Sequence, residues 1–210
     1  MAASSKTLST ALQPGPATRR VGWVPVRTLN ARHRSRIAAH LLALGERGRR
    51  LRFGHLVSDG QIRRYVEQLD FARDEVFGVF NRRLDLVALG HLACLPADAG
   101  ASAELGASVA AGTRGRGLGT RLFVHAMVRT RNRKIRTLVI HAERANSAML
   151  QIARQAGAKL KFEGTEAVAH LALAEGNLAS HIRARFEERA AELDYRLKRH
   201  TRRTPGPARE

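Results

Sequence analysis

The chain has 210 residues, a formal net charge of +19 and a hydrophobic content of 44%. This length is sufficient for one buried core with an appendage at each end, and the hydrophobic content is normal for a globular domain. A single cysteine excludes a framework of internal disulfides, and no apolar run approaches the ~20 residues that a membrane span requires. These features predict a cytoplasmic protein without a membrane anchor.

The positive charge has two interpretations. Lys and Arg number 37 against 18 Asp and Glu, and nearly all the basic residues are arginines spread along the chain. Such an excess is typical of nucleic-acid binders, but aromatic residues make up only 5% of the chain, too few for a base-stacking surface. A composition rich in Ala, Gly and Arg is also what a GC-rich genome produces. We favour this second interpretation and keep nucleic-acid binding as the alternative.

The N-terminal half of the chain predicts a tail, a strand, two helices and a hairpin. Residues 1–20 lack the apolar core of a signal peptide and are predicted to be disordered. Apolar stripes at three- and four-residue spacing support both helices, and a capping box opens the second. The predicted elements are a strand at 21–29, a helix at 30–44, a helix beginning at Ser58-Asp59-Gly60-Gln61, and hairpin strands at 75–80 and 84–95.

A glycine-rich turn, Arg114 to Thr120 (RGRGLGT), separates a predicted strand at 103–110 from a helical pattern that begins at Leu118. Glycines at alternate positions leave the junction without side chains, so a bulky anion can reach backbone N–H groups and the positive end of the helix dipole. A Walker A loop does not fit, because no Lys follows the last glycine. A Rossmann fingerprint does not fit the G-x-G-x-G spacing. The turn is a candidate phosphate-binding site.

The segment after this helix continues as alternating strands and helices. A β-branched apolar run predicts a buried strand at 135–142. Asn146 or Ser147 is the expected N-cap of the next helix, and Gly157 its C-terminal stop. Two final strands are predicted at 159–163 and 167–174.

In this setting, the pattern Arg114-x-x-Gly117-x-Gly119 resembles the acyl-CoA pyrophosphate loop of the GNAT superfamily of N-acetyltransferases. The order of predicted elements over residues 21–175 is similar to the GNAT order. The resemblance implies an α/β (α+β) GNAT fold, with a central mixed twisted sheet of about six or seven strands flanked by helices. The fragment Arg50–Gly54 (RLRFG) and the strand AELGASVA look particularly like bacterial protein-lysine acetyltransferase catalytic domains.

The resemblance also implies the ligands of the site: acetyl-CoA as cosubstrate, no metal, and an amine acceptor that is a protein lysine or a small molecule. A backbone N–H around Val109 would polarise the thioester carbonyl. Nine histidines are scattered without a pair at metal-ligand spacing. The expected cofactor contacts are Val109, Arg114, Gly115, Arg116, Gly117, Leu118, Gly119, Thr120 and Asn146.

Transfer of an acetyl group to an amine requires removal of a proton from the amine. Glu104 is the candidate general base, because it lies where many protein-acetylating relatives carry their catalytic glutamate. A solvent-facing glutamate at a strand start is the equally weighted alternative, and Glu75 is a weaker candidate base. Many GNAT enzymes place a Tyr seven residues after the helix Asn to protonate the departing thiolate, and here that position is Ala153.

Residues 176–200 predict a further amphipathic helix, followed by a disordered end. Its apolar face has to be buried by docking on its own domain, in a homodimer or against a partner, and we favour self-docking. The predicted division is a tail at 1–20, an acetyltransferase domain at 21–175 and a C-terminal segment at 176–210. We expect an acetyl-CoA-dependent N-acetyltransferase, with a CoA-binding or nucleic-acid-binding GNAT-like protein of little catalytic activity as the alternative.

Overall fold

The structure is a computed structural model, and it describes residues 25–95, 102–173 and 194–195. The predicted tail and nearly all of the predicted C-terminal helix lie outside these residues. The division into three parts, and a homodimer through the C-terminal helix, therefore stay predictions. Tyr195 is described, and its ring lies 3.6 Å from the guanidinium carbon of Arg27 and 5.1 Å from the ring of Phe80.

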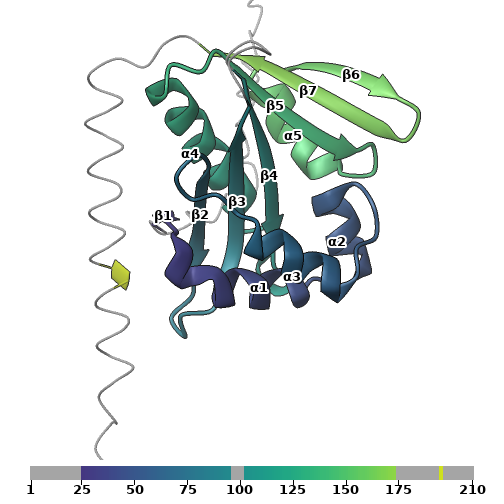
Figure 1. The fold of residues 1–210 in the computed structure, drawn as a ribbon. Helices are drawn as coiled ribbons and strands as arrows, with labels where there is room; N and C mark the ends of the chain where they lie inside the picture. The colour runs from purple at the N-terminus through teal and green to yellow at the C-terminus, as the bar shows by residue number, and fades with distance from the viewer. Residues whose placement is uncertain (1–24, 96–101, 174–193, 196–210) are drawn as a thin grey trace, which may run out of the picture.

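The described residues form a mixed α/β fold (Figure 1). The strands are β1 (Arg27–Thr28), β2 (Glu75–Phe80), β3 (Leu86–Cys94), β4 (Ser102–Val109), β5 (Thr137–Glu143), β6 (Lys159–Glu163) and β7 (Glu166–Ala172). The helices are α1 (Arg34–Leu42), α2 (Glu46–Phe53), α3 (Asp59–Glu67), α4 (Leu118–Asn132) and α5 (Ser147–Gln155), with short 3-10 turns at Ala31–His33 and Ala111–Thr113.

The strands form one seven-stranded sheet in the order β1-β2-β3-β4-β5-β7-β6. Every neighbouring pair is antiparallel except β4 and β5, which are parallel. That parallel pairing covers only Ser102–Glu104 of β4, although the strand continues to Val109. The sheet therefore forks after Glu104, and the β5-β7-β6 half diverges from the rest in Figure 1.

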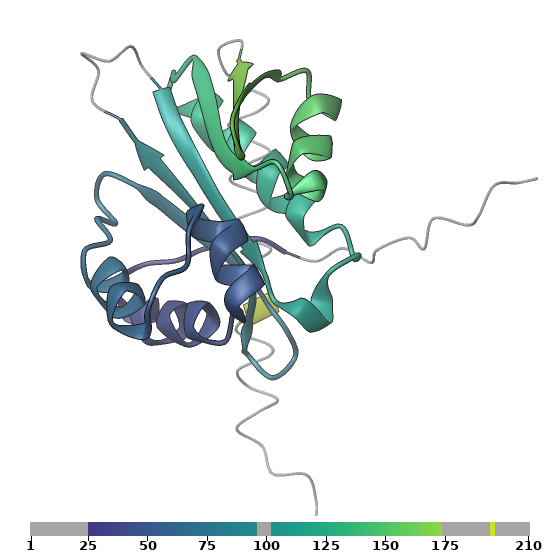
Figure 2. The ribbon, with the colours of Figure 1, turned by 90° about the vertical axis from the view of Figure 1, so that its right-hand side faces the viewer.

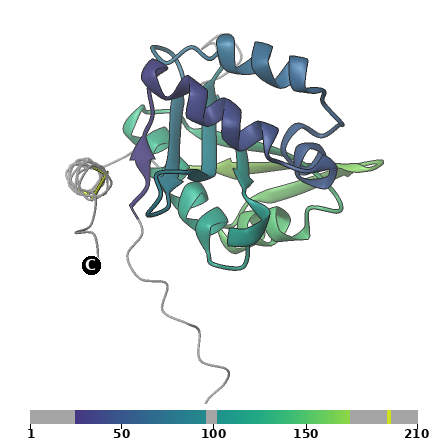
Figure 3. The same ribbon diagram turned by 90° about the horizontal axis from the view of Figure 1, so that it is seen from below.

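Helices cover both faces of the sheet. In Figure 3, α1 and α3 lie on one side of the strands and α4 and α5 on the other. Each layer encloses its own apolar cluster: Ile37, Leu41 and Ile62 pack under α1 and α3, whereas Leu122, Phe123 and Ala153 pack under α4 and α5. The forked sheet is therefore packed against helices on both of its faces.

The predicted elements largely coincide with the observed ones. The expected sheet of six or seven strands is confirmed, with seven strands. The strands at 75–80 and 159–163 have the predicted bounds. The capping box is also confirmed, because the backbone N–H of Ser58 donates to Gln61 Oε1 over 2.8 Å and the Gln61 N–H donates to Ser58 Oγ over 3.3 Å. Of the strand predicted at 21–29 the structure describes residues 25–29, and within these only Arg27–Thr28 pair with β2.

Helix α2 was missed by the sequence analysis. Its segment carries few apolar residues, so it shows no stripe at helical spacing. The available signals were weaker: Glu46 in the first turn, arginines in the last turn, and Gly54 as a left-handed stop with φ of +77°. Figure 2 shows that α2 and α5 both face the side on which the sheet opens.

Candidate active site

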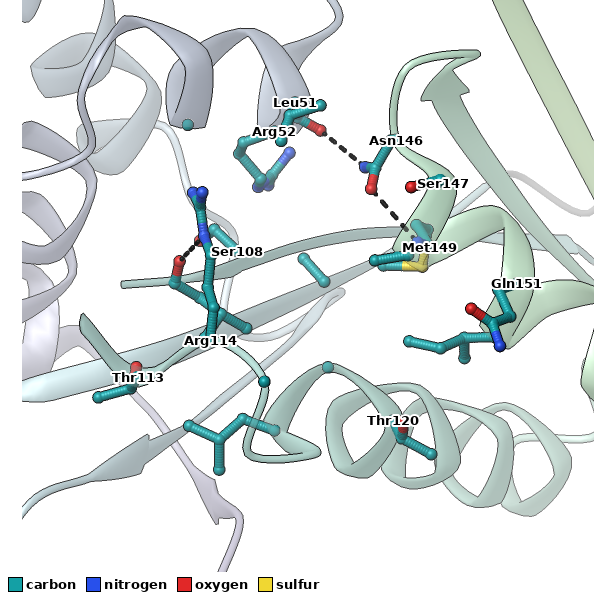
Figure 4. A pocket seen from close by; sticks show the side chains of 18 of the residues that line it. Leu51, Arg52, Ser108, Thr113, Arg114, Thr120, Asn146, Ser147, Met149 and Gln151 are labelled. Atoms are coloured by element: carbon teal, nitrogen blue, oxygen red, sulfur yellow. Dashed lines mark hydrogen bonds between the residues drawn. The ribbon is translucent and has the colours of Figure 1, made fainter. Parts of the chain in front are cut away.

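A pocket of about 480 Å³ lies where the sheet forks (Figure 4). Its walls come from α2, from the end of β4, from the glycine turn with the start of α4, and from the start of α5. The lining residues are Leu44, Arg47, Gly48, Leu51, Arg52, Ala107, Ser108, Val109, Thr113, Arg114, Gly115, Gly117, Leu118, Gly119, Thr120, Ala145, Asn146, Ser147, Ala148, Met149, Gln151, Ile152 and Gln155. Three arginines and no acidic residue belong to this lining, so the pocket favours an anionic ligand.

The glycine turn places the N-terminus of α4 at the pocket. Gly115 and Gly117 have φ of +73° and +72°, the left-handed region that glycine adopts without strain. Gly117 is the N-cap, and the first helical hydrogen bond runs from the Arg121 N–H to the Gly117 carbonyl over 3.1 Å. The N–H groups of Leu118, Gly119 and Thr120 precede that bond, so they have no acceptor within the helix and can serve an anion.

The two arginines of the turn differ in position. Arg114 lines the pocket, and its Nε donates to the Val109 carbonyl over 3.3 Å. Its Nη2 also lies close to α2, 3.4 Å from where a side chain on Gly48 would begin. Arg116 is exposed and does not belong to the lining residues. Of the nine predicted cofactor contacts, Arg116 is therefore the one that the pocket leaves out.

The last residues of β4 direct backbone groups into the fork. In the antiparallel ladder with β3, the Ala110 N–H donates to the Val87 carbonyl over 2.9 Å, and Val109 is paired with Ala88. Hydrogen-bonding direction alternates along such a ladder, so the Val109 N–H points away from β3. On that side β5 has already diverged. The Val109 N–H is a donor that faces the fork.

Asn146 joins the two helices that border the pocket. Its Oδ1 accepts from the Met149 N–H over 3.3 Å, so Asn146 rather than Ser147 is the N-cap of α5. Its Nδ2 donates to the Leu51 carbonyl of α2 over 3.5 Å (Figure 4). One side chain thus caps α5 and attaches it to α2.

Glu104 lies at the fork but not among the lining residues of the pocket. It is half-buried on β4, on the same strand face as Gly106 and Ser108, which is the face covered by α1 to α3. Within the described part of the chain its carboxylate forms no ion pair or hydrogen bond. Glu75, by contrast, is buried and paired with Arg129 over 2.5 Å and Arg133 over 3.0 Å, away from the pocket.

Ala153 is fully buried in the core under α5. It neither lines the pocket nor carries a group that could move a proton. Over the described residues, no cluster of three or more His, Cys, Asp or Glu side chains could hold a metal ion, and no helix has the length and apolarity needed to cross a membrane.

The sequence analysis missed the contribution of α2 and its preceding turn to the pocket. Leu44, Arg47, Gly48, Leu51 and Arg52 all line it. Only the RLRFG fragment drew attention to this segment, and it did so without indicating a helix. The signal that could have predicted α2 was a pair of glycines, Gly45 and Gly54, at the two ends of a segment rich in basic residues.

No protein-family model matches the sequence, and no curated protein matches it. Solved structures do. The GNAT domain of S. lividans PAT is 21% identical with a TM-score of 0.60, over 70% of this chain and 89% of that one. A GNAT superfamily phosphinothricin acetyltransferase (Pat) from Sinorhizobium meliloti, in complex with AcCoA, is 12% identical with a TM-score of 0.55, over 73% and 90%.

A third similar structure is the ribosomal-protein-alanine N-acetyltransferase from Brucella melitensis, at 18% identity and a TM-score of 0.51, over 69% of this chain and 96% of that one. Identities this low carry information about the fold and not about the substrate. The three proteins nevertheless share one architecture with the forked sheet described above. The chain has the GNAT acetyltransferase fold.

Proposed function

We propose that the protein is an N-acetyltransferase that moves the acetyl group of acetyl-CoA to an amine. The observation that carries the proposal is the pocket at the fork of β4 and β5, where the glycine turn, the start of α4 and the β4 edge meet. A GNAT fold with such an opening provides an anion-binding end and a row of backbone donors in one cavity.

The anion-binding end suits the pyrophosphate of CoA. The N–H groups of Leu118, Gly119 and Thr120 and the guanidinium of Arg114 are the proposed contacts, with Gly115 and Gly117 forming the turn. Asn146 borders the opposite wall through its cap on α5. Arg116, which is exposed outside the lining, is left to contribute long-range attraction rather than a direct contact.

The β4 edge suits the thioester. The Val109 N–H, directed into the fork, would donate to the thioester oxygen and stabilise the negative charge that grows there during attack. Glu104 would accept the proton of the amine, directly or through a water molecule. The neutral amine then attacks the carbonyl carbon, and collapse of the tetrahedral intermediate breaks the C–S bond and releases the CoA thiolate.

No acid for that thiolate is assigned, since Ala153 occupies the position of the family Tyr. A thiolate is a much better leaving group than an amine, because the pKa of a thiol lies near 8.5. The reaction therefore proceeds without a dedicated acid on α5, and solvent supplies the proton.

The test combines a search for the acceptor with one variant. Labelled acetyl-CoA is incubated with a cell extract and the purified protein, and label is followed into protein lysines and into small molecules. With an acceptor in hand, Glu104→Gln is expected to lower kcat by about 10²- to 10⁴-fold, the usual contribution of a general base. Glu67→Gln, an exposed glutamate of α3, is the matched control.

Two outcomes would contradict parts of the proposal. Full activity of Glu104→Gln would remove Glu104 as the base while leaving the acetyltransferase intact. Absence of transfer to any acceptor, together with RNA binding that weakens steeply with salt, would favour the alternative of a nucleic-acid-binding protein with little catalysis.

A further inference from the structure

Arg52, on α2, is held in a fixed position inside the pocket. Its Nη2 donates to the hydroxyl of Tyr65 over 2.6 Å, and its guanidinium carbon lies 5.4 Å from the centre of the Tyr65 ring and 4.9 Å from that of Phe53. A guanidinium fixed by a hydrogen bond and two aromatic rings has lost most of its rotamer freedom before any ligand arrives.

The guanidinium also lies directly against the backbone of β4. A Cβ on Gly106 would meet Nη1 of Arg52 first, and then Cζ at 2.5 Å and Nη2 at 2.6 Å, so no larger residue fits there without moving the arginine. Gly106 is two residues after Glu104 on the same strand face, about 7 Å along the strand. Arg52 therefore contacts β4 two residues from the proposed base, and it lines the same pocket as the glycine turn.

A chain of buried polar side chains stands behind Arg52. Tyr65 Oη lies 2.7 Å from His91 Nδ1, and His91 Nε2 lies 3.1 Å from Asp74 Oδ2. Because an arginine can only donate, the Tyr65 hydroxyl accepts from Arg52 and gives its own proton to His91 Nδ1. The remaining His91 proton is then on Nε2, facing the buried carboxylate of Asp74.

The protonation states of Tyr65 and His91 agree with a hydrogen bond that the Tyr65 hydroxyl donates to His91. Burial raises the pKa of Tyr65, partly opposed by Arg52, which keeps the phenol protonated. Burial lowers the pKa of His91 despite its hydrogen bond to Asp74, which keeps the imidazole neutral. The negative charge of Glu104 raises the pKa of both groups, so it acts on the same cluster.

Such a chain has a cost, because buried polar groups lose their hydration. Apolar side chains from the same elements would pack between the sheet and the helices without that loss. On Arg52, Nη2 is bonded to Tyr65. Nη1 has no hydrogen-bond partner among the described residues, so it can donate to a ligand. Arg52 and Glu104 likewise form no ion pair with each other. A cation with an unbonded donor and an unbonded carboxylate therefore lie at the same stretch of β4, at positions two residues apart along one strand face.

We propose that Arg52 binds the carboxylate of the acceptor, and that the acceptors are small amines that carry a carboxylate, as free amino acids do. The inference rests on the proposed acetyltransferase function and adds its substrate class. Arg52 Nη1 receives the carboxylate and Glu104 the amine proton. Tyr65, His91 and Asp74 are positioning residues that act through Arg52. Arg114 is left to the phosphates of CoA.

The test compares amines that carry a carboxylate with related amines that lack one. L-Phenylalanine is compared with 2-phenylethylamine, and L-lysine with 1,5-diaminopentane and with Nα-acetyl-L-lysinamide, by the rate of CoA release. The wild type is expected to have the higher kcat/KM for each carboxylate, by about 10- to 100-fold, the range for one charge-assisted hydrogen bond. Arg52→Gln is expected to abolish this ratio, while the rate with the decarboxylated amines remains measurable.

A second variant separates positioning from folding. Tyr65→Phe keeps the ring and the charge of Arg52 but removes the hydroxyl, so it is expected to lower the carboxylate preference and leave the rate with the decarboxylated amines unchanged. Loss of rate with both members of each pair would mean a merely structural role. Arg50→Gln, an exposed arginine of α2 outside the pocket lining, is the control and keeps the wild-type ratio.

The inference is overturned if the wild type acetylates both members of each pair equally, if it prefers the lysinamide, or if the preference survives Arg52→Gln. Where none of these amines is acetylated, calorimetry of L-phenylalanine with CoA present decides: binding lost in Arg52→Gln supports the subsite, and absence of binding to the wild type overturns it. Failure of acetyl-CoA itself to bind would instead count against the proposed function.

Discussion

The side-chain amide of Asn146 donates to the backbone carbonyl of Leu51 over 3.5 Å, across 95 residues of sequence. This bond joins the start of α5 to α2, two helices that both line the pocket. Because the same side chain also caps α5, the width of the opening is coupled to the integrity of one helix terminus.

Replacement of Asn146 separates its two roles. Asn146→Ala removes both bonds and is expected to lower the free energy of unfolding by about 1 kcal/mol, the usual value of an N-cap. Asn146→Asp keeps an acceptor for the Met149 N–H but loses the donor to Leu51, so most of the stability should remain. Chemical denaturation measures the first effect, and calorimetric affinity for acetyl-CoA the second.

The affinity should fall in both variants, because both release α2 from α5 and the aspartate adds a negative charge to an anion-binding pocket. Ser147→Ala is the control for the cap, since Ser147 is the first residue of α5 and not its N-cap. Equal stability of Asn146→Ala and the wild type would contradict the capping role.

The sequence predicted most of the fold because its signals are local. Ser58 with Gln61, Asn146 and the glycines of the turn each determine a helix terminus through one or two neighbouring bonds. The first strand was predicted less well, because only Arg27–Thr28 of the described residues 25–29 are paired. Its length is set by pairing with β2, a contact between segments about 50 residues apart, which propensity does not encode.

The lining of the pocket was predictable where it follows a motif and not where it depends on packing. The turn and Asn146 were located because Arg, Gly and Asn stand at recognisable spacings. Arg52 was not, because its position depends on Tyr65 of α3 and on the absence of a side chain at Gly106 of β4, so that three separate elements meet there. The spacing of residues in the sequence carries no information about contacts between residues of different elements.

Gly119→Val tests the assignment of the turn to phosphate. A Cβ at this position meets only Ile152 Cδ1, at 3.5 Å, an ordinary contact, so the fold should persist. The branched side chain instead enters the pocket where the N-terminal N–H groups of α4 are open. We expect the affinity for acetyl-CoA to fall by at least ~10-fold, the value of a charge-assisted hydrogen bond, with an unchanged Tm.

Gly60→Ala is the matched control, because it lies in the first turn of α3 and its Cβ would meet only Ser58 Oγ, at 3.9 Å, an ordinary contact. Its affinity for acetyl-CoA should equal that of the wild type. Wild-type affinity in Gly119→Val would show that the phosphates bind elsewhere.

Glu75→Gln distinguishes a structural carboxylate from a base. Its two oxygens are bonded to Arg129 and Arg133, so the neutral amide removes one negative charge from beside two partly buried cations. We expect the free energy of unfolding to fall by about 1–3 kcal/mol, and kcat at a temperature below the transition to remain unchanged. A loss of kcat comparable to that of Glu104→Gln would instead indicate that Glu75 is the base. Glu166→Gln, which changes an exposed glutamate of β7, is the control.

His125 makes the stability depend on pH. Its ring packs 4.6 Å from that of Phe77 under α4, Nε2 is buried without a partner among the described residues, and burial, helped by the charge of Arg129, lowers its pKa from 6.5 to about 4. Between pH 6.5 and pH 4 the imidazole of His125 is protonated in the unfolded chain but neutral in the folded chain. Stability therefore falls as the pH decreases from 6.5 towards 4, by up to about 1.4 kcal/mol per pH unit for this residue.

Denaturation midpoints at pH 7, 6 and 5 measure this slope. His125→Phe cannot be protonated and keeps an aromatic ring against Phe77, so its stability should depend less steeply on pH than that of the wild type. Part of the slope remains, because burial also lowers the pKa of His33 to about 4. His55→Gln, at an exposed position after α2, should leave the wild-type slope unchanged. If His125→Phe had the same slope as the wild type, the buried imidazole would not be the group that titrates.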